Sequence, residues 1–393
     1  MVVLESFQLF SLGIILVGVL LFSLVERKLG FPPLLGAVFI GIILGQSGIN
    51  FITYDQLPEW LSFFSLIGGM LILFVVGMET NIRDLVTTSK KSLSITALGI
   101  FFPAIFVLIA GTLFHFGIKQ TALLVAAATM TATPTSLALL IALKKTHTRA
   151  AQYLHASTIM DNIIGIFFIL LLIAVHESGT VDFYELAKLT ALLIFLIGIS
   201  YTVMPKVSKY IFNRFGHPSP ESRITIAFAL ILFLGAVTSQ FLFEAAFGAF
   251  LAGIMMSEIK EEYKKQLLKT FREIGEGLFF PLFFLTIGLA VNVESVLFSV
   301  TLLAFLTAYI AIAILGKFAG GYYGALLSNL NRKEAVAIGS GLIPRGGIGL
   351  IAAQIGLSLH IFTPEQFSAV VLMVFFTTVI GFYFIYKTFS QLK

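Results

Sequence analysis

Apolar stretches long enough to cross a lipid bilayer recur along the whole chain, with short polar segments between them. A spanning helix needs roughly 20 apolar residues. Hydrophobic residues make up 58% of the 393 residues and charged residues only 11%, whereas soluble domains average about 45–50% apolar and about 25% charged residues. Because lipid offers no hydrogen bonds to the backbone, the apolar stretches must be helical. The sequence therefore predicts an all-α polytopic membrane protein embedded in a lipid bilayer.

We predict thirteen spanning helices, each bounded by polar or turn-forming residues. The first span lacks a basic leader and runs into Glu26, Arg27 and Lys28 rather than a small-residue cleavage site, so we expect it to remain as a helix. The approximate ranges of the spans are 7–25, 32–49, 61–78, 93–117, 121–143, 151–175, 185–204, 224–241, 243–257, 275–291, 297–327, 335–358 and 366–386.

Lysine and arginine alternate from one connection to the next, and this alternation predicts the orientation. The connections after spans 1, 3, 5, 7, 9 and 11, together with the C-terminal tail, hold 21 of the 25 basic residues. The connections after the even-numbered spans hold only Lys119 and Lys188. Basic loops stay on the cytoplasmic side. We therefore expect a protein of the bacterial inner or plasma membrane, with its N-terminus outside and its C-terminus in the cytoplasm.

Three charged residues lie deep inside predicted spans. They are Asp161 in "TIMDNIIGI", Lys317 in "AIAILGKFAGGYYG" and Arg345 in "GLIPRGGIGL". Inserting such a charge costs at least about 2.5 to 3.5 kcal/mol, so these residues are candidates for function. Burial disfavours the charged form of an isolated acid or amine, whereas two opposite charges that meet stabilise each other. Asp161 and Lys317 form either a cation- and proton-binding pair or a static bridge between spans 6 and 11.

Two spans contain residues that interrupt a helix. Span 5 carries "TMTATPTS", in which Pro134 cannot donate a backbone hydrogen bond and the neighbouring hydroxyls include Thr131 and Thr133. Span 12 carries "IPRGGIG" around Arg345. Its helix-breaking residues are Pro344, Gly346 and Gly347.

The two breaks lie seven spans apart, which predicts an internal repeat. In secondary transporters, interrupted helices at corresponding positions of two repeats flank the substrate site. We expect spans 1–6 and 8–13 to form inverted repeats joined by span 7, all within one transporter domain, residues 1–393. The general frequency of proline and glycine in membrane helices explains either break alone, whereas two breaks in register favour a transport site.

Six motifs, in this order and spacing, resemble the monovalent cation:proton antiporter-2 family, whose wider relatives include NhaA-like sodium/proton antiporters and Kef-type potassium efflux systems. The motifs are "GMETNIRDL" after span 3, "TATPTS" in span 5, "MDNIIG" in span 6, "FGAFLAGIMMSE" in span 9, "EIGEGLFFPLFFLTIGL" opening span 10 and "GLIPRGGIGLIAAQIG" in span 12. The resemblance covers essentially the whole chain. It implies an NhaA-like fold with two crossing interrupted helices, a homodimer, and a mobile six-helix part that carries the site across the membrane in an elevator-like motion.

The resemblance also implies roles for single residues. Asp161 and Asn162 stand where family members have their ion-binding pair, so Na⁺ or K⁺ is expected there. Lys317 matches the basic residue that pairs with the first position in electrogenic members. The remaining matches are Thr131, Thr133 and Pro134 at the first break and Arg345 at the second.

The sequence departs from the family pattern at Asn162. Members usually keep the carboxylate at the second position of the pair, whereas this chain keeps it at the first, Asp161. One explanation is a substitution that mimics the protonated carrier, because an amide has the shape of a protonated carboxyl and does not titrate near neutral pH. A second is a natural protein in which Asp161 alone titrates and exchange is electroneutral. A third is the loss of proton coupling.

Other polar residues have a lower weight. Ser157 and Thr158 share a helix face with Asp161, and their hydroxyls either coordinate an ion or return a hydrogen bond to the backbone. His155, six residues before Asp161, is expected to be an interfacial residue. The predicted rim residues, which are solvated or tune the pH response, are Glu79, Arg83, Glu244 and Glu258.

The predicted function is the exchange of Na⁺ or K⁺ for protons. A potassium efflux pathway, a uniporter without proton coupling and a non-transporting membrane sensor are the alternatives. The sequence offers no nucleophile–base set, metal cluster or phosphate-binding loop, so we predict no enzyme activity, no cofactor and no nucleic-acid partner. The segment "SEIKEEYKKQLLKTFREIGEG" is expected to form a cytoplasmic amphipathic connector, and no soluble regulatory domain is predicted.

Overall fold

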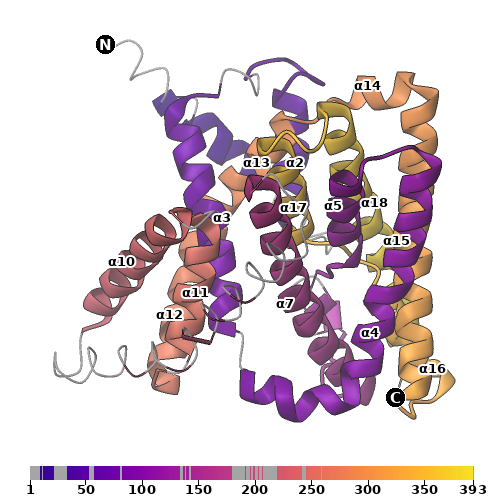
Figure 1. The fold of residues 1–393 in the computed structure, drawn as a ribbon. Helices are drawn as coiled ribbons and strands as arrows, with labels where there is room; N and C mark the ends of the chain where they lie inside the picture. Colours follow the sequence, from indigo (N-terminus) through magenta and orange to yellow (C-terminus); the bar gives the residue numbers. More distant parts are fainter. Residues whose placement is uncertain are drawn as a thin grey trace.

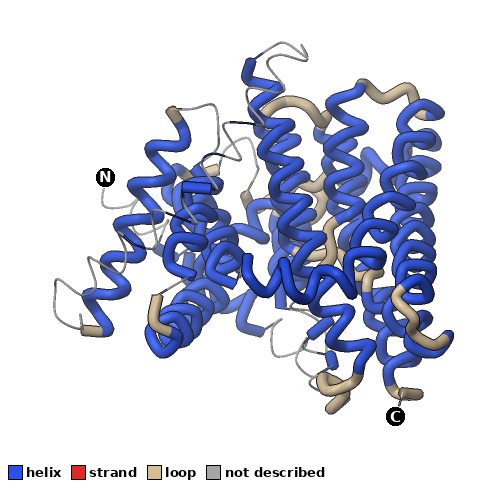
Figure 2. Tube along the Cα trace, turned by 60° about the horizontal axis from the view of Figure 1, so that its bottom comes forward, coloured by secondary structure: helices blue, strands red, loops and turns tan. Residues whose placement is uncertain are grey.

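A computed structural model shows how the chain folds. It describes residues 9–10, 12–21, 33–52, 57–79, 82–132, 136–137, 139–140, 143–178, 219–240, 245–257 and 259–392, and single helical positions at 191, 195, 198, 199, 202 and 206. Within these residues every regular element is helical (Figures 1 and 2), so the predicted all-α class is confirmed. Six of the described helices are long and apolar enough to cross a membrane.

The helices follow the predicted spans closely. Predicted spans 2–6 and 8–13 each contain at least one described helix, whereas span 7 lies almost wholly outside the described residues. The elements are α2 (Pro33–Leu44), α3 (Glu59–Glu79), α4 (Ile82–Leu113), α5 (Ile118–Thr129), α7 (Arg149–Ser178), α10 (Pro220–Ser239), α11 (Ala245–Ser257), α12 (Glu261–Ile274), the π-helical turn η2 (Gly275–Phe279), α13 (Phe280–Leu289), α14 (Val293–Phe298), α15 (Val300–Leu327), α16 (Arg332–Gly341), α17 (Gly347–Ser358) and α18 (Pro364–Phe389).

Side-chain caps fix where the helices around the second break begin. The side chain of Asn331 accepts a hydrogen bond from the Glu334 amide, and Glu334 accepts one from the Asn331 amide, at 3.0 and 2.9 Å. Thr363 and Gln366 form the same reciprocal cap before α18, with Pro364 at its first turn. Such caps satisfy amide groups that a helix start leaves unpaired. They define the start of α16 and of α18.

The described helices pack in two groups, which Figure 1 shows on opposite sides of the molecule. The panel helices α2, α3, α10, α11 and α13 contact one another, as in the pairs α2–α13, α3–α11 and α10–α11. The site helices α4, α5, α7, α15, α16, α17 and α18 form the second group, in which α4 packs along α15 and against α7. The short helix α14 connects the end of α13 to α15. The fold thus separates the panel from the unit that holds the buried residues Asp161, Lys317 and Arg345.

Glycine contacts bring the panel backbones together. A β-carbon added at Gly41 would lie 2.8 Å from Gly288 Cα, and one added at Gly253 would lie 2.8 Å from Gly77 Cα. Only a residue without a side chain allows two helices to approach this closely. The pairs α2–α13 and α3–α11 are therefore each closed by one pair of facing glycines.

The predicted amphipathic connector is α12. Phe271 is buried on its apolar side, with ring centroids 4.8 Å from Phe74 of α3 and 5.0 Å from Phe228 of α10. Arg272, on the polar side, forms an ion pair with Glu79 at the end of α3. The connector is thus fastened along the ends of two panel helices.

Candidate ion-binding site

The two interrupted helices meet at their breaks. The first helix stops at Thr129, and Met130 has extended backbone angles. The amide of Ala132 then donates a hydrogen bond of 2.9 Å to the carbonyl of Pro344, in the gap between α16 and α17. Gly346 lies against the same place, because a β-carbon there would be 2.8 Å from Ala132 Cβ. The expected contact between spans 5 and 12 is therefore present, at the level of backbone against backbone.

Asp161 and Lys317 form a fully buried ion pair beside the first break. Lys317 Nζ of α15 lies 2.5 Å from Asp161 Oδ2 of α7, and neither side chain is exposed. Thr131 Oγ1 donates a second hydrogen bond to the same carboxylate oxygen at 3.1 Å. The other oxygen, Asp161 Oδ1, has no hydrogen-bond partner among the described residues. A buried carboxylate normally satisfies both oxygens, so Oδ1 is the group that remains available to a ligand.

Small residues make room for the buried amine. Next to Lys317, a β-carbon at Gly316 would lie 2.7 Å from Pro103 Cα, and one at Gly320 would lie 2.3 Å from the Leu98 carbonyl oxygen. Helix α15 therefore approaches α4 at backbone distance on both sides of Lys317. The lysine stem is enclosed between the two helices, and its charge is directed to α7.

The polar residues near Asp161 on α7 are all buried, but two of them bond to the backbone of their own helix. Asn162 is buried next to Asp161 with 7% of its surface exposed. Ser157 and Thr158 are also buried, but their hydroxyls donate to the carbonyls of Leu154 and His155, three residues earlier, at 2.9 and 3.0 Å. Both hydroxyls therefore donate to backbone carbonyls of α7, and the structure does not bring them to Asp161.

Arg345 clamps the second break to its surroundings. Its Nη1 donates to the Leu342 carbonyl at 3.0 Å, and its Nη2 donates to the Ala313 carbonyl of α15 at 2.7 Å. Its own carbonyl accepts from Thr378 Oγ1 at 2.6 Å. The Gly341 carbonyl accepts from Ser136 Oγ at 3.0 Å. Together with the Ala132–Pro344 bond, four backbone carbonyls at the second break therefore accept hydrogen bonds from protein donors. They are those of Gly341, Leu342, Pro344 and Arg345.

Several predicted residues lie elsewhere or outside the described part. Gly347 lies next to the ring of Phe284 in α13 rather than next to Asp161. Thr133 and Pro134, together with Glu244 and Glu258, are outside the described residues, and so is the side chain of Arg83. The sequence reasoning missed three contacts: the Thr378 and Ser136 bonds to the second break, and a bond of Tyr309 to α5. Ser136 lies in the quoted "TATPTS" motif, which was the available signal.

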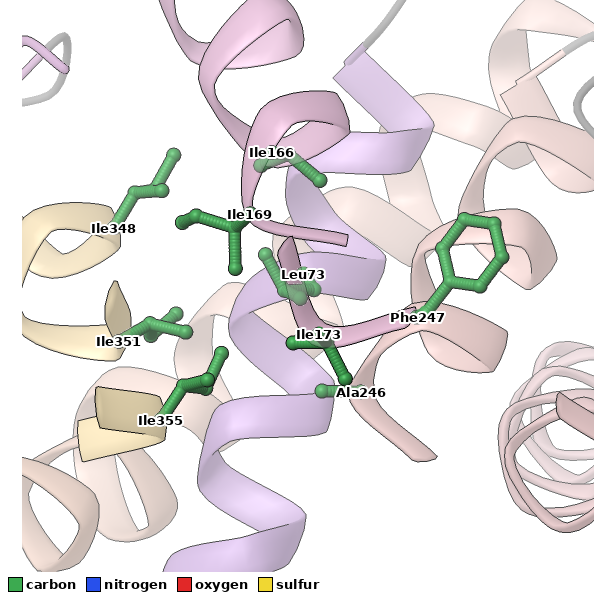
Figure 3. Close-up of a pocket in the computed structure, with 9 residues that line it drawn as sticks. All are labelled: Leu73, Ile166, Ile169, Ile173, Ala246, Phe247, Ile348, Ile351 and Ile355. Carbon is green, nitrogen blue, oxygen red and sulfur yellow. The ribbon is translucent and has the colours of Figure 1, made fainter. Parts of the chain in front are cut away.

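An apolar pocket lies between the panel helices and the site helices (Figure 3). Ile166, which follows Asn162 by four residues and so shares its face of α7, is one of its lining residues. Aliphatic side chains from both helix groups complete the wall, as Figure 3 shows. The lining consists of Leu73, Ile166, Ile169, Ile173, Ala246, Phe247, Ile348, Ile351 and Ile355. The face of α7 that carries Asn162 therefore changes from polar to purely aliphatic within one turn.

The oxygens around Asp161 determine what the site binds. Carboxylate, hydroxyl and carbonyl oxygens suit hard cations, whereas soft ligands select transition metals. The described residues contain no group of three or more His, Cys, Asp or Glu side chains that could hold a metal ion. The chemistry available next to Asp161 is thus that of a hard cation in competition with a proton and an ammonium group.

Comparisons with known proteins give a consistent result. The family model described as "Sodium/hydrogen exchanger, transmembrane" matches residues 13–386. The probable Na⁺/H⁺ antiporter GerT of Bacillus cereus is 30% identical over 370 residues, which cover 92% of this chain and 94% of that protein. The Na⁺/H⁺-K⁺ antiporter GerN of Bacillus cereus is 28% identical over 378 residues, covering 94% and 93%.

A solved structure has a similar fold. The sodium proton antiporter MjNhaP1 of Methanocaldococcus jannaschii, determined at pH 8, superposes with a TM-score of 0.74 and 16% sequence identity. The alignment covers 98% of this chain and 97% of that chain. At this identity the likeness concerns the fold alone.

Proposed function

This chain belongs to the sodium/hydrogen exchanger family, and on that premise we propose that it exchanges Na⁺ or K⁺ for protons at Asp161. The observation that carries the proposal is the buried pair in which one oxygen of Asp161 bonds Lys317 and Thr131 while the other has no partner among the described residues. The names of GerT and GerN mention Na⁺ and protons, and that of GerN also K⁺, which supports this choice of substrates.

Charge balance supports one-for-one exchange. Before the cation arrives, the Lys317 ammonium compensates the Asp161 carboxylate, so the pair is neutral. A cation that binds at Asp161 Oδ1 adds one positive charge to a buried site, and an uncompensated charge there is costly. Release of one proton from Lys317 restores neutrality. Because Asn162 does not titrate near neutral pH, Asp161 and Lys317 then perform the exchange without net movement of charge.

Paired contacts in the panel support the proposed inverted repeat. If spans 2 and 3 correspond to spans 9 and 10, the contact Gly41–Gly288 becomes the contact Gly253–Gly77 when the halves are exchanged. Both contacts occur, and in each a β-carbon added to one glycine would lie 2.8 Å from the Cα of the other. The breaks at Ala132 and Pro344 then occupy the pseudo-symmetry centre, where the repeat places a transport site.

The boundary between the two helix groups supports movement of one against the other. The pocket of Figure 3 is lined by apolar side chains from both groups, which have no hydrogen bonds to break when the surfaces slide. By the predicted topology this pocket lies on the external side of Asp161. A hydrated cation does not enter such an apolar constriction. We therefore assign this conformation to a state closed toward the outside. The homodimer stays a prediction.

The test is proton flux in proteoliposomes with a pH-sensitive dye, on addition of Na⁺, K⁺ or Li⁺. The unmodified protein should exchange, and a clamped membrane potential should leave the rate unchanged. If it is inactive and only Asn162→Asp exchanges, Asp161 is not sufficient and the proposal fails in this form. Cation flux that moves no protons would instead support the uniporter alternative.

A further inference from the structure

One face of α15 contacts three parts of the site at successive turns. Tyr309 Oη donates a hydrogen bond of 2.6 Å to the Leu124 carbonyl in α5. One turn further, the Ala313 carbonyl accepts from Arg345 at the second break. After another turn, Lys317 pairs with Asp161 on α7. Residues spaced by four share a helix face, so a single rigid stripe touches both interrupted helices and the buried acid.

These contacts form a closed circuit. Leu124 precedes the end of α5 by five residues, about one and a half turns. From that end the chain leads to the Ala132–Pro344 backbone bond, and from there to Arg345, which returns to α15. A shift of α5 along its axis would have to break the Tyr309 bond, the Ala132 bond, or both. The circuit therefore fixes the height of Thr131 relative to Asp161.

The environment of Tyr309 favours a positioning role for its hydroxyl. The side chain is fully buried, and its ring stacks on Phe305 with centroids 5.3 Å apart. Phe305 in turn packs edge-on against Phe114 and Phe116. A phenylalanine would satisfy all of this packing. What the hydroxyl adds is the bond to α5, and this bond offsets the cost of burying a polar group in an apolar environment.

We propose that Tyr309 is a positioning residue for the cation site: its bond to the Leu124 carbonyl sets the register of α5 so that Thr131 reaches the Asp161 carboxylate. This inference rests on the proposed function, because it assumes that a cation binds beside Asp161. Tyr309 itself touches neither the ion nor the acid, so its effect passes through α5.

The test compares Tyr309→Phe with Tyr322→Phe. Tyr322 is a half-buried tyrosine on the same helix, and its hydroxyl has no hydrogen bond to the described residues. The apparent Kd for Na⁺ is measured from the rise of Tm with Na⁺ concentration, which reports binding to the folded state. Loss of one neutral buried hydrogen bond should raise this Kd about threefold to tenfold in Tyr309→Phe. Tyr322→Phe should keep the parent value. An unchanged Kd in Tyr309→Phe, even with a lower Tm, would overturn the inference.

Two further variants separate positioning from stability. In a Thr131→Val background, Tyr309→Phe should have little additional effect on the Kd, because the hydroxyl that it positions is gone; full additivity contradicts the proposal. Incorporation of 3-fluorotyrosine at position 309 keeps the shape and the donor, so the Kd should not rise. A rise as large as that of Tyr309→Phe would assign the effect to packing.

The result is distinguishable from failure of the proposed function. If the parent protein shows no cation-dependent rise in Tm and no exchange, the proposed function fails before any variant is compared. If the parent protein binds Na⁺ and Tyr309→Phe binds it equally well, only the positioning role fails.

Discussion

The two interrupted helices cross at one point, but they use their freed backbone groups in different ways. At the second break, the carbonyls of Gly341, Leu342, Pro344 and Arg345 all accept hydrogen bonds from protein donors. At the first break, the Thr131 hydroxyl is directed to Asp161, whose second oxygen has no hydrogen-bond partner in the described part of the chain. We infer that the two breaks have different roles: the second break holds the contact between the helices in place, and the first contributes to the proposed ion site.

The largest expected effect comes from removing the acid. Asp161→Asn should reduce cation-driven proton flux to the level of empty liposomes, because no carboxylate remains beside the first break to bind the cation. It also leaves Lys317 buried without its partner, which costs about 3–5 kcal/mol of stability. The double variant with Lys317→Met should recover stability but not flux. Measurable exchange by Asp161→Asn would show that the pair is only a structural bridge.

A large effect on stability, rather than on cation binding, is expected from a change at Arg345. Arg345→Lys keeps the charge but cannot hold the Leu342 and Ala313 carbonyls together, because an ammonium is a point charge and not a planar fork. Loss of one charged hydrogen bond should lower the free energy of unfolding by about 1.5–3 kcal/mol. The Kd for Na⁺ should change less than threefold in the protein that remains folded. A Kd that changes more than stability does would place Arg345 in the ion site.

Lys317→Ala should shift the pH profile of exchange toward alkaline pH. Without Lys317 the exchanged proton has to be carried by Asp161 itself. The Asp161 anion has also lost the ammonium that stabilised it, so the proton competes with the cation more effectively and more base is needed before the cation binds. Flux measured at a series of pH values, together with Tm, checks this. An unchanged profile with unchanged Tm would remove Lys317 from the site, whereas a lower Tm alone would make it a structural residue.

The smallest effects come from a matched pair of hydroxyl deletions. Thr131→Val removes a hydroxyl that bonds Asp161, and Ser136→Ala removes one that bonds the second break. Each should lower stability by about 1 kcal/mol. Only Thr131→Val should also raise the Kd for Na⁺, by about threefold to tenfold. Equal effects on the Kd would mean that the two breaks are not specialised.

The sequence was most informative where burial leaves few choices. Asp161 and Lys317 needed partners within the membrane. The seven-span spacing of the two breaks indicated that the breaks would meet. The partners of Arg345 were not predictable, because they are backbone carbonyls that any sequence carries. Ser157 and Thr158 share the face of Asp161 as expected, but side-chain rotation decides where a hydroxyl donates, and helical spacing does not report it.

The helix boundaries also show what the sequence can and cannot predict. The predicted start of span 4 at residue 93 agrees with the apolar stretch that begins at Ser92, whereas the helix α4 itself begins at Ile82. Hydropathy marks where a helix enters lipid, whereas the hydrogen-bonded helix continues through the polar residues before it.

Tyr309 gave no signal, since an uncharged aromatic residue in an apolar span resembles ordinary packing. Its register with Lys317, eight residues away, was visible only once its partner in α5 was known.

The facing glycines of the panel have a consequence for how this protein can change over generations. At Gly41, Gly77, Gly253 and Gly288 even a methyl group would separate two helices, so every nucleotide change that alters one of these residues is expected to be lost. The surrounding side chains are free to diverge. If the two halves are the repeats proposed above, they could become unlike in almost every position and still contact each other at the same two pairs of glycines.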